Sequence, residues 1–236
     1  KTDAGTYPMG LEAKQFTNNN TNFTNVKFEV EDGKLTIKPV EIELTANSNS
    51  KVYDGEALTD SDYKITKGAF VGEEGLASVT VEGSQTQVGT NANKITGYTL
   101  KDNTKAENYT ITTIDGTLEV TPKNIVPGEN NKDLTATAPK DVVYSGESQQ
   151  QKPVVKDGEK TLVEDTDYTL TYSKDTTNAG TVTVTINGKG NYDGEFDVTY
   201  QITPAPLKIT TNSAEKTYDE SALTAGGKIE GVVERD

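Results

Sequence analysis

The side chains that could do chemistry in this chain are carboxylates. Asp60 and Asp62, and again Asp165 and Asp167, form Asp-x-Asp-Tyr sequences ahead of two expected strands. Carboxylates on one loop are typical ligands of calcium, a hard cation that takes roughly six to eight oxygens. A turn whose Asp side chains accept hydrogen bonds from nearby backbone amides explains the same pattern, and a calcium loop closed by Glu is missing. These four residues are the candidate metal ligands, and we expect no other cofactor.

The missing residue types exclude further chemistry. The 236 residues contain no His, Cys or Trp. A Ser-His-Asp or Cys-His nucleophile, a Cys/His zinc site and a disulfide therefore cannot form. Carboxylate pairs also serve glycoside hydrolysis, but among 37 acidic residues such pairs arise by chance. Because a tandem array of small repeats makes a poor preformed cleft, we expect no enzyme and no catalytic residue.

Tyrosines offer a second kind of site. Sugar-binding faces use aromatic rings, which bury well and keep a polar edge, and Tyr98 and Tyr172 are the candidate ligand-binding residues. Cross-strand packing explains the same tyrosines. A Lys–Asn or Lys–Asp isopeptide cross-link is a further hypothesis for a chain without cysteine.

Net charge and hydropathy limit the kinds of partner that this chain can bind. The formal net charge is −14 and hydrophobic residues make up 32%. A basic face suited to nucleic acid is not expected, and no apolar run approaches the ~18–20 residues of a membrane span. The composition lies close to the disordered range, so the β patterning must decide that the chain folds. The chain begins at Lys1, which favours a piece of a longer protein.

Three segments end alike, which predicts a tandem repeat. The sequences GKLTIKP, GTLEVTP and VTYQITP close at prolines that are 83 and 82 residues apart. A tyrosine follows each proline, and a Gly-Thr step and an Asn before an aromatic residue precede each one. Because every repeat must build the same core, recurrence indicates a packing role. The structural landmarks are Pro39, Pro122, Pro204, Tyr53, Tyr144 and Tyr218.

The apolar alternation changes parity at each proline. Leu118 and Val120 precede Pro122 at even positions, whereas Ile125 follows it at an odd one. A one-residue slip moves every side chain to the other face of a strand, so each proline is interpreted as the point where an extended chain leaves one core and enters the next. The loop-like stretch 127–132 either lets the array bend or, in another phasing, lies inside a module.

The turns between strands are predicted from Asp-Gly pairs. Val26, Phe28 and Val30 alternate before Asp32-Gly33, and two apolar residues alternate after it. This pattern predicts a hairpin with a two-residue turn. Residues 73–77 are compatible with one short helical turn, and no longer helical period is present.

Several of these segments resemble a known repeat family. Residues 51–59 (KVYDGEALT), Gly89-Thr90, residues 108–110 (NYT) and residues 116–122 (GTLEVTP) are similar to the YDG/MBG-type repeats, mostly-β modules found in tandem in bacterial surface and adhesin-like proteins. In the following repeat, residues 167–168 (DY), 178–181 (NAGT), 188–192 (GKGNY) and 202–204 (ITP) resemble a sister repeat of gut Firmicutes surface proteins. Ser145 and Glu220 depart from the Tyr-Asp-Gly pattern. The resemblance implies a Gram-positive, extracellular stalk or adhesion role, with no catalytic residue.

We therefore expect an all-β fold of tandem small modules, each an immunoglobulin-like sandwich or a β-grasp-like sheet. Residues 1–40 would form the C-terminal half of a module, 41–123 and 124–205 complete modules, and 206–236 an N-terminal half. The expected function is a stalk, spacer or adhesive region on a bacterial cell surface; the alternative is a carbohydrate- or protein-binding module of a surface protein or secreted enzyme. The expected partners are neighbouring modules and host or bacterial surface glycans or proteins, without nucleic acid or membrane insertion.

Overall fold

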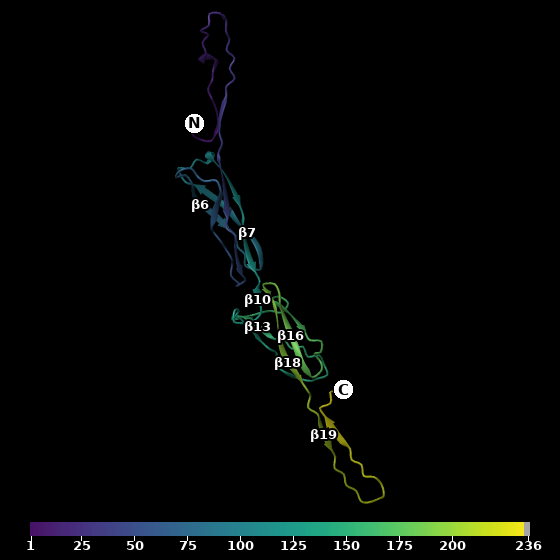
Figure 1. Cartoon of the computed structure of the whole chain (residues 1–236). Coiled ribbons are helices and arrows are strands. Elements are labelled where there is room, and N and C mark those ends of the chain that lie inside the picture. The colour runs from purple at the N-terminus through teal and green to yellow at the C-terminus, as the bar shows by residue number, and fades with distance from the viewer. Residues whose placement is uncertain (234–236) are drawn as a thin grey trace. The chain divides into compact units, whose positions relative to one another are not determined.

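The computed structural model describes residues 1–233 and is β almost throughout (Figure 1). Within these residues the helices are two short 3-10 turns, η1 (Ala13–Gln15) and η2 (Ala106–Asn108). The expected all-β fold is therefore confirmed. None of the described helices is long and apolar enough to cross a membrane. Two compact units, Lys1–Thr121 and Pro122–Asp236, divide the chain and are described separately.

Unit 1 contains a complete two-sheet module. A three-stranded sheet has the order β5–β3–β8, and a four-stranded sheet has the order β4–β9–β7–β6. Ile42 and Leu44 of β3 are fully buried, and Ile95 of β7 packs against them from the other sheet. In chain order the strands are β3 (Val40–Ala46), β4 (Asn49–Val52), β5 (Tyr63–Lys67), β6 (Leu76–Glu82), β7 (Gly89–Leu100), β8 (Tyr109–Ile114) and β9 (Gly116–Thr121).

Two neighbouring strands change sheets together. β3 and β8 pair in parallel, and their continuations β4 and β9 pair in parallel in the opposite sheet. At the change-over a Cβ on Gly116 would lie 2.2 Å from the carbonyl oxygen of Asn47, so only glycine fits there. The Asp115-Gly116 pair therefore links two sheets, although in other proteins such pairs are typical of hairpins.

The hairpin predicted around Asp32-Gly33 near the N-terminus is wrong. Residues 26–30 form no strand, and β2 (Lys34–Ile37) pairs instead with β1 (Gly5–Pro8). Apolar alternation identifies a strand-like segment but not its partner, because the partner is chosen by a core elsewhere in the sequence. The short helical turn expected over residues 73–77 is also wrong, since β6 begins at Leu76.

Unit 2 repeats this plan. One sheet has the order β12–β18–β16–β15, a second β11–β13–β14, and β10 pairs in parallel with β17. β12 pairs in parallel with β18, as β4 does with β9. Val182, Val184, Tyr200 and Ile202 form the core. The strands are β10 (Lys123–Asn124), β11 (Leu134–Thr137), β12 (Val142–Val143), β13 (Val154–Asp157), β14 (Lys160–Thr161), β15 (Tyr168–Tyr172), β16 (Gly180–Gly188), β17 (Tyr192–Asp193) and β18 (Glu195–Thr203).

All three repeats share one strand pairing, the glycine–proline register, between a landmark glycine and the strand that ends at a landmark proline. Each landmark glycine pairs with the residue two positions before the closing proline: Gly5 with Ile37, Gly89 with Val120, and Gly180 with Ile202. All three glycines have positive φ, at 149°, 136° and 155°. The repeat detected in the sequence is therefore a repeat of strand pairing.

The prolines lie between strands, and at Pro122 the buried face changes as predicted. Leu118 and Val120 are buried before Pro122, and Ile125 is buried after it. The loop at 127–132 lies between β10 and β11, both inside unit 2. The phasing that makes this stretch an internal loop is therefore the one that the structure favours.

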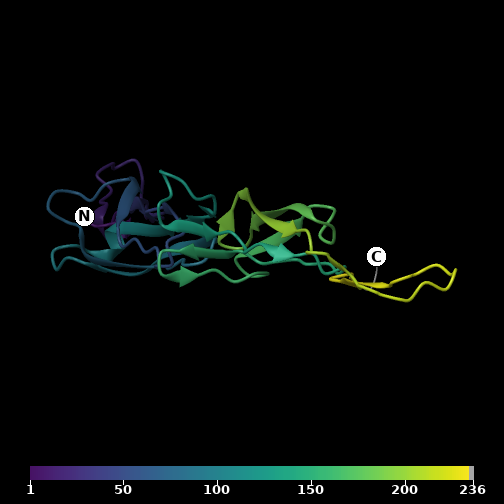
Figure 2. The same cartoon turned by 90° about the horizontal axis from the view of Figure 1, so that it is seen from below.

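A two-stranded ribbon accompanies each module. β1 and β2 form one in unit 1, and β19 (Lys208–Thr211) and β20 (Gly227–Glu230) form the other in unit 2. Figures 1 and 2 both show β19 and β20 as a hairpin with no third strand beside it. Residues 205–233 are called the C-terminal half-module below.

Candidate functional site

The Tyr-Asp-Gly landmark is a structural turn. The backbone N–H of Glu56 donates to Asp54 Oδ1 at 2.9 Å, and Lys51 Nζ lies 2.6 Å from the same oxygen. Gly55, between them, has φ of 86°. The Lys51 ammonium and then the Glu56 amide lower the pKa of Asp54. The carboxylate is therefore occupied in holding the chain reversal.

The other repeats conserve this geometry with different residues. In unit 2 the hydroxyl of Ser145 accepts from the N–H of Glu147, and Gly146 has φ of 75°. In the C-terminal half-module Asp219 Oδ1 accepts from the N–H of Ser221 at 3.0 Å, with Glu220 at φ of 67°. Glu220 thus adopts the left-handed conformation that glycine takes elsewhere, at an expected cost of ~1–2 kcal/mol. The residues that depart from the Tyr-Asp-Gly pattern therefore keep the turn.

The landmark tyrosines of the two complete modules form backbone hydrogen bonds to the end of their own module. The backbone N–H of Tyr53 donates to the carbonyl of Thr121 at 2.9 Å, and that of Tyr144 donates to Thr203 at 2.8 Å. Both acceptors immediately precede a landmark proline. These backbone bonds extend the pairing of β4 with β9 and of β12 with β18. The side chain of Tyr53 is buried and that of Tyr144 packs against the core of unit 2, which is a packing role. Tyr218 lies on the C-terminal half-module and is exposed.

The first pair of candidate calcium ligands lies in a turn before β5. Asp60 Oδ1 accepts from the backbone N–H of Asp62 at 2.9 Å, and its Oδ2 accepts from Asn49 Nδ2 at 3.3 Å. The carbonyl of Asp60 also accepts from Asn93 Nδ2 at 3.0 Å. These hydrogen bonds are those of a capped turn.

The second pair is built differently. Asp167 is buried, its Oδ2 accepts from the N–H of Val163 at 2.9 Å, and its Oδ1 lies 3.5 Å from Lys160 Nζ. Asp165 has φ of 67°, a local reason for an Asp at this position. In residues 1–233 no group of three or more His, Cys, Asp or Glu side chains is close enough to hold a metal ion. The structure thus adds no third carboxylate to either pair.

The two candidate ligand-binding tyrosines differ in the solvent exposure of their rings. Tyr172 packs against the core of unit 2, and its hydroxyl donates to the carbonyl of Gln151 at 3.1 Å. Tyr98 lies on β7 opposite Val79 of β6 and is exposed. Only Tyr98 of this pair presents a ring to solvent, so it is the better candidate for a stacked ligand.

A buried asparagine was missed by the sequence reasoning. Asn93 is fully buried at the sheet change-over, opposite Gly116, and its Nδ2 donates to the carbonyls of Asn47 and Asp60 at 2.9 and 3.0 Å. A Cβ on Gly83 would lie 2.7 Å from Asn93 Oδ1, so the two residues are in close contact. An Asn at an inward-facing strand position was the available signal.

A cavity of about 390 Å³ lies where the N-terminal residues meet the module of unit 1. Ala4 N–H donates to Asn108 Oδ1, and Asp3 accepts from Lys105 Nζ at 2.7 Å. Tyr109, Glu74 and Val71 also line this cavity, and the Tyr109 hydroxyl donates to Glu74 and accepts from the N–H of Val71. Burial, followed by the hydrogen bond to Glu74, raises the pKa of Tyr109. These polar groups satisfy one another, as in a structural junction.

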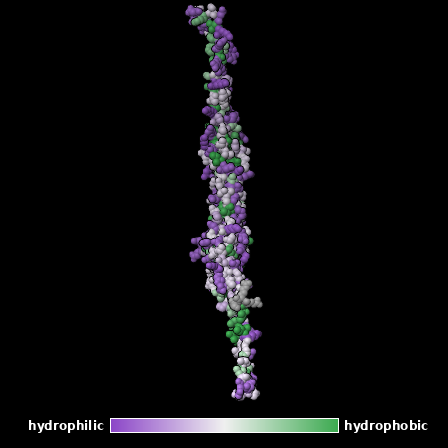
Figure 3. All heavy atoms as spheres, turned by 90° about the vertical axis from the view of Figure 1, so that its right-hand side faces the viewer, coloured by the Kyte–Doolittle hydropathy of each residue, from purple (hydrophilic) through white to green (hydrophobic). Residues whose placement is uncertain are grey.

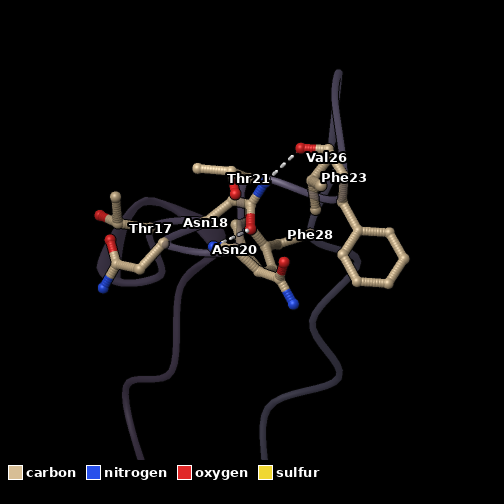
Figure 4. Close-up of a pocket in the computed structure, with 8 residues that line it drawn as sticks. Thr17, Asn18, Asn20, Thr21, Phe23, Val26 and Phe28 are labelled. Carbon is tan, nitrogen blue, oxygen red and sulfur yellow. Dashed lines mark hydrogen bonds between the residues drawn. The ribbon is translucent and has the colours of Figure 1, made fainter.

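An open hollow of about 690 Å³ lies in the loop preceding β2, lined by Asn and Thr side chains with Phe23, Val26 and Phe28 (Figure 4). Asn18 Nδ2 donates to the carbonyl of Phe23 at 2.8 Å, and its Oδ1 accepts from the N–H of Asn20. The ring of Phe23 points away from the other labelled side chains. The amides therefore hold the loop, and the exposed ring is the group left to meet a ligand.

An ion pair and an apolar groove complete the candidate sites of unit 2. Lys123 Nζ lies 2.6 Å from Asp157 Oδ1, with both side chains largely shielded, and the Tyr192 hydroxyl donates to Asp157 Oδ2 at 3.1 Å. This pair is the natural place to look for a Lys–Asp cross-link. A groove of about 630 Å³ runs past Ala179 and Leu207.

Comparison with known proteins adds no relative. No protein-family model, curated protein or solved structure matches this chain, so its assignment rests on the residues and geometry described above.

Proposed function

We propose that these modules form a non-catalytic extracellular stalk, spacer or adhesive region of a bacterial surface protein. One observation carries the proposal: the same glycine–proline strand register recurs three times along the chain. A repeated self-contained core with short connections is a way to build length from identical units. Function in such an array resides in spacing and surface contact.

The junctions support a spacer role. β2 ends at Ile37 and β3 begins at Val40, and between β9 and β10 there is only Pro122. Connections this short, each with a proline of restricted φ, suit a chain that runs from one strand directly into the next. An acidic surface makes neighbouring stalks repel one another. Because the chain has no cysteine, its folded state does not depend on redox conditions.

Two experiments test this proposal. Small-angle scattering of the full chain should give a radius of gyration well above the ~18 Å expected for a compact domain of this length; a value near ~18 Å would contradict a spacer. Protease treatment of intact bacteria that produce the protein should remove the modules from the cell surface. Complete protection in intact cells, with cleavage after lysis, would contradict the extracellular location.

Binding to a glycan or a protein is the second candidate function. Its support is two of the exposed aromatic side chains, Tyr98 on β7 and Phe23 in the lining of the loop hollow. Aromatic stacking would predict that Tyr98→Ala or Phe23→Ala abolishes binding on a glycan array. Val163→Ala, at an exposed position far from both in sequence, is the control.

A further inference from the structure

The first and last segments of the complete module in unit 1 lie side by side and run in the same direction. Residues 40–45 pair in parallel with residues 109–114, and residues 49–52 pair in parallel with residues 118–121. In both sheets each residue pairs with the one 69 positions later, so the change of sheet does not interrupt the register. These ten pairs are called the terminal ladder below.

A pull on the two ends of the module loads the terminal ladder in shear. The chain enters the module at Val40 and leaves it after Thr121, and these residues belong to the first and the last pair of the ladder. Because hydrogen bonds in a sheet run between strands, tension along the strands loads all the pairs at the same time. A ladder pulled apart from one end would instead lose its pairs one after another.

The buried face of the terminal ladder also resists sliding. Ile42 and Leu118 are fully buried, whereas the pair Glu41 and Thr110 is exposed. Hydrophilic side chains, in purple, are spread over the face of the molecule that Figure 3 shows. Because side chains alternate between faces, a slip of one residue would turn apolar side chains to solvent. The shortest slip that keeps them inside is two residues, ~6.6 Å, and it breaks every pair.

The exit end of the ladder carries the same side-chain hydrogen bond in both complete modules. Thr121 Oγ1 donates to the carbonyl of Lys51 at 3.3 Å, and Thr203 Oγ1 donates to that of Val142 at 3.2 Å. Each threonine immediately precedes a landmark proline, and its own carbonyl accepts from the N–H of a landmark tyrosine. The hydroxyl therefore strengthens the pairing at the point where the chain leaves the module.

The corresponding ladder in unit 2 is shorter and interrupted. β10 pairs with β17 at two positions and β12 pairs with β18 at two more, and β11 lies between β10 and β12 in the chain. An ion pair adds a further link, since Lys123 Nζ of β10 lies 2.6 Å from Asp157 Oδ1 of β13. Fewer backbone pairs therefore share a pull on this module.

We propose that the complete modules are load-bearing elements that resist tension along the chain, and that the terminal ladder of unit 1 resists more force than its counterpart in unit 2. The use of this resistance in the cell rests on the proposed stalk function, whereas the response of a module to force does not. Scattering and surface proteolysis test the stalk function, and pulling experiments test the load-bearing property. Resistance of this kind depends on the direction of the pull, because the same ladder can be sheared or unzipped.

Optical tweezers applied to the full chain in two directions test this dependence. Handles on the two termini shear the terminal ladder. The chain has no cysteine, so Lys38→Cys with Glu107→Cys places handles beside Val40 and Tyr109, which form the first pair of the ladder. Pulling there unzips it. The unit 1 module should need several-fold more force to unfold between the termini than between these cysteines. Equal forces in the two directions would overturn the proposal.

A disulfide assigns the unfolding events to the two units. Glu41→Cys with Thr110→Cys joins two exposed partners of the ladder, and its reduced form is the control. Between the termini, each complete module of about eighty residues should lengthen the chain by about 250 Å when it unfolds. Oxidation should remove the long extension that occurs at the higher force. Loss of the lower-force extension instead would contradict the order proposed for the two modules.

Thr121→Val tests the hydroxyl at the exit end, because valine keeps the branched shape. The variant should unfold the unit 1 module under constant force about two- to tenfold faster, which corresponds to the loss of one hydrogen bond. Thr117→Val makes the same change at an exposed position of β9 and should leave the rate unchanged. Equal rates in the two variants would refute the role assigned to the Thr121 hydroxyl.

Discussion

Replacement of Asn93 tests whether the sheet change-over holds unit 1 together. Its Nδ2 donates to the carbonyls of Asn47 and Asp60, which come from the chain between β3 and β4 and from the turn before β5. Asn93→Ala removes the Nδ2 donor, so both carbonyls lose this hydrogen-bond partner at a buried position. Asn93→Val keeps more of the side-chain volume and removes only the polar group, so the two variants separate the cavity from the hydrogen bonds.

The magnitude follows from the two lost hydrogen bonds. A buried group left without its partner costs roughly 1–3 kcal/mol, so two carbonyls set an upper range of about 2–6 kcal/mol. Asn93 Oδ1 has no hydrogen-bond partner among the described residues, and its removal offsets part of this cost. We expect Asn93→Ala to lower the free energy of unfolding by about 1–4 kcal/mol. Asn93→Val should show most of the same loss.

Hydrogen exchange followed by mass spectrometry is the suitable assay, because it reports each unit separately. Peptides from unit 1 should exchange faster in both variants, and peptides from unit 2 serve as the internal reference. The matched control is Asn91→Ala, two residues away on β7, where the exposed side chain donates to the carbonyl of Ser84; it should cost less than about 1 kcal/mol. Equal protection in Asn93→Val and the original chain would refute the role assigned to these hydrogen bonds.

The remaining predictions concern backbone strain, a titrating tyrosine and an ion pair. Gly68→Ala should lower the urea midpoint of unit 1 more than Gly72→Ala. Both have positive φ, but only at Gly68 would the new Cβ meet a carbonyl of β3; equal shifts would contradict this. Glu74→Gln should lower the raised pKa of Tyr109 in a carbon NMR titration, though burial keeps it above the ordinary value. Because the folded pKa is the higher one, the stability that this hydroxyl contributes is complete below pH ~10 and is lost as the pH rises through the folded pKa; an unchanged pKa in Glu74→Gln would refute the coupling. Lys123→Met should destabilise unit 2 by about 1–3 kcal/mol, measured by circular dichroism during urea unfolding, because a shielded carboxylate loses its cation; an unchanged midpoint would show that the pair contributes nothing.

Patterns that repeat locally were readable from the sequence. The landmark prolines, the change of buried parity at Pro122 and the all-β class follow from residue types and a period of two. The Tyr-Asp-Gly turn is equally local, because Asp54 and the amide it accepts from are two residues apart. Such features need no knowledge of distant segments.

The partners of the strands were not readable. The sequence predicted that Val26, Phe28 and Val30 would pair across Asp32-Gly33, yet β2 pairs with β1, because the register of a distant landmark glycine decides the sheet. The candidate sites show the same limit. Asp60 and Asp167 were predicted from spacing, but only the fold shows that turn amides, Asn49 and Lys160 occupy their oxygens.

The sequence by itself determined that this chain is a β repeat with landmarks about every eighty residues and without His, Cys or Trp chemistry. Only the tertiary structure decided that two parallel strands change sheets together, that Asn93 holds that change-over, and that the apolar residues of the C-terminal half-module are exposed. The physical reason is that alternation along a strand specifies which side chains share a face. What covers that face depends on segments far away in the chain.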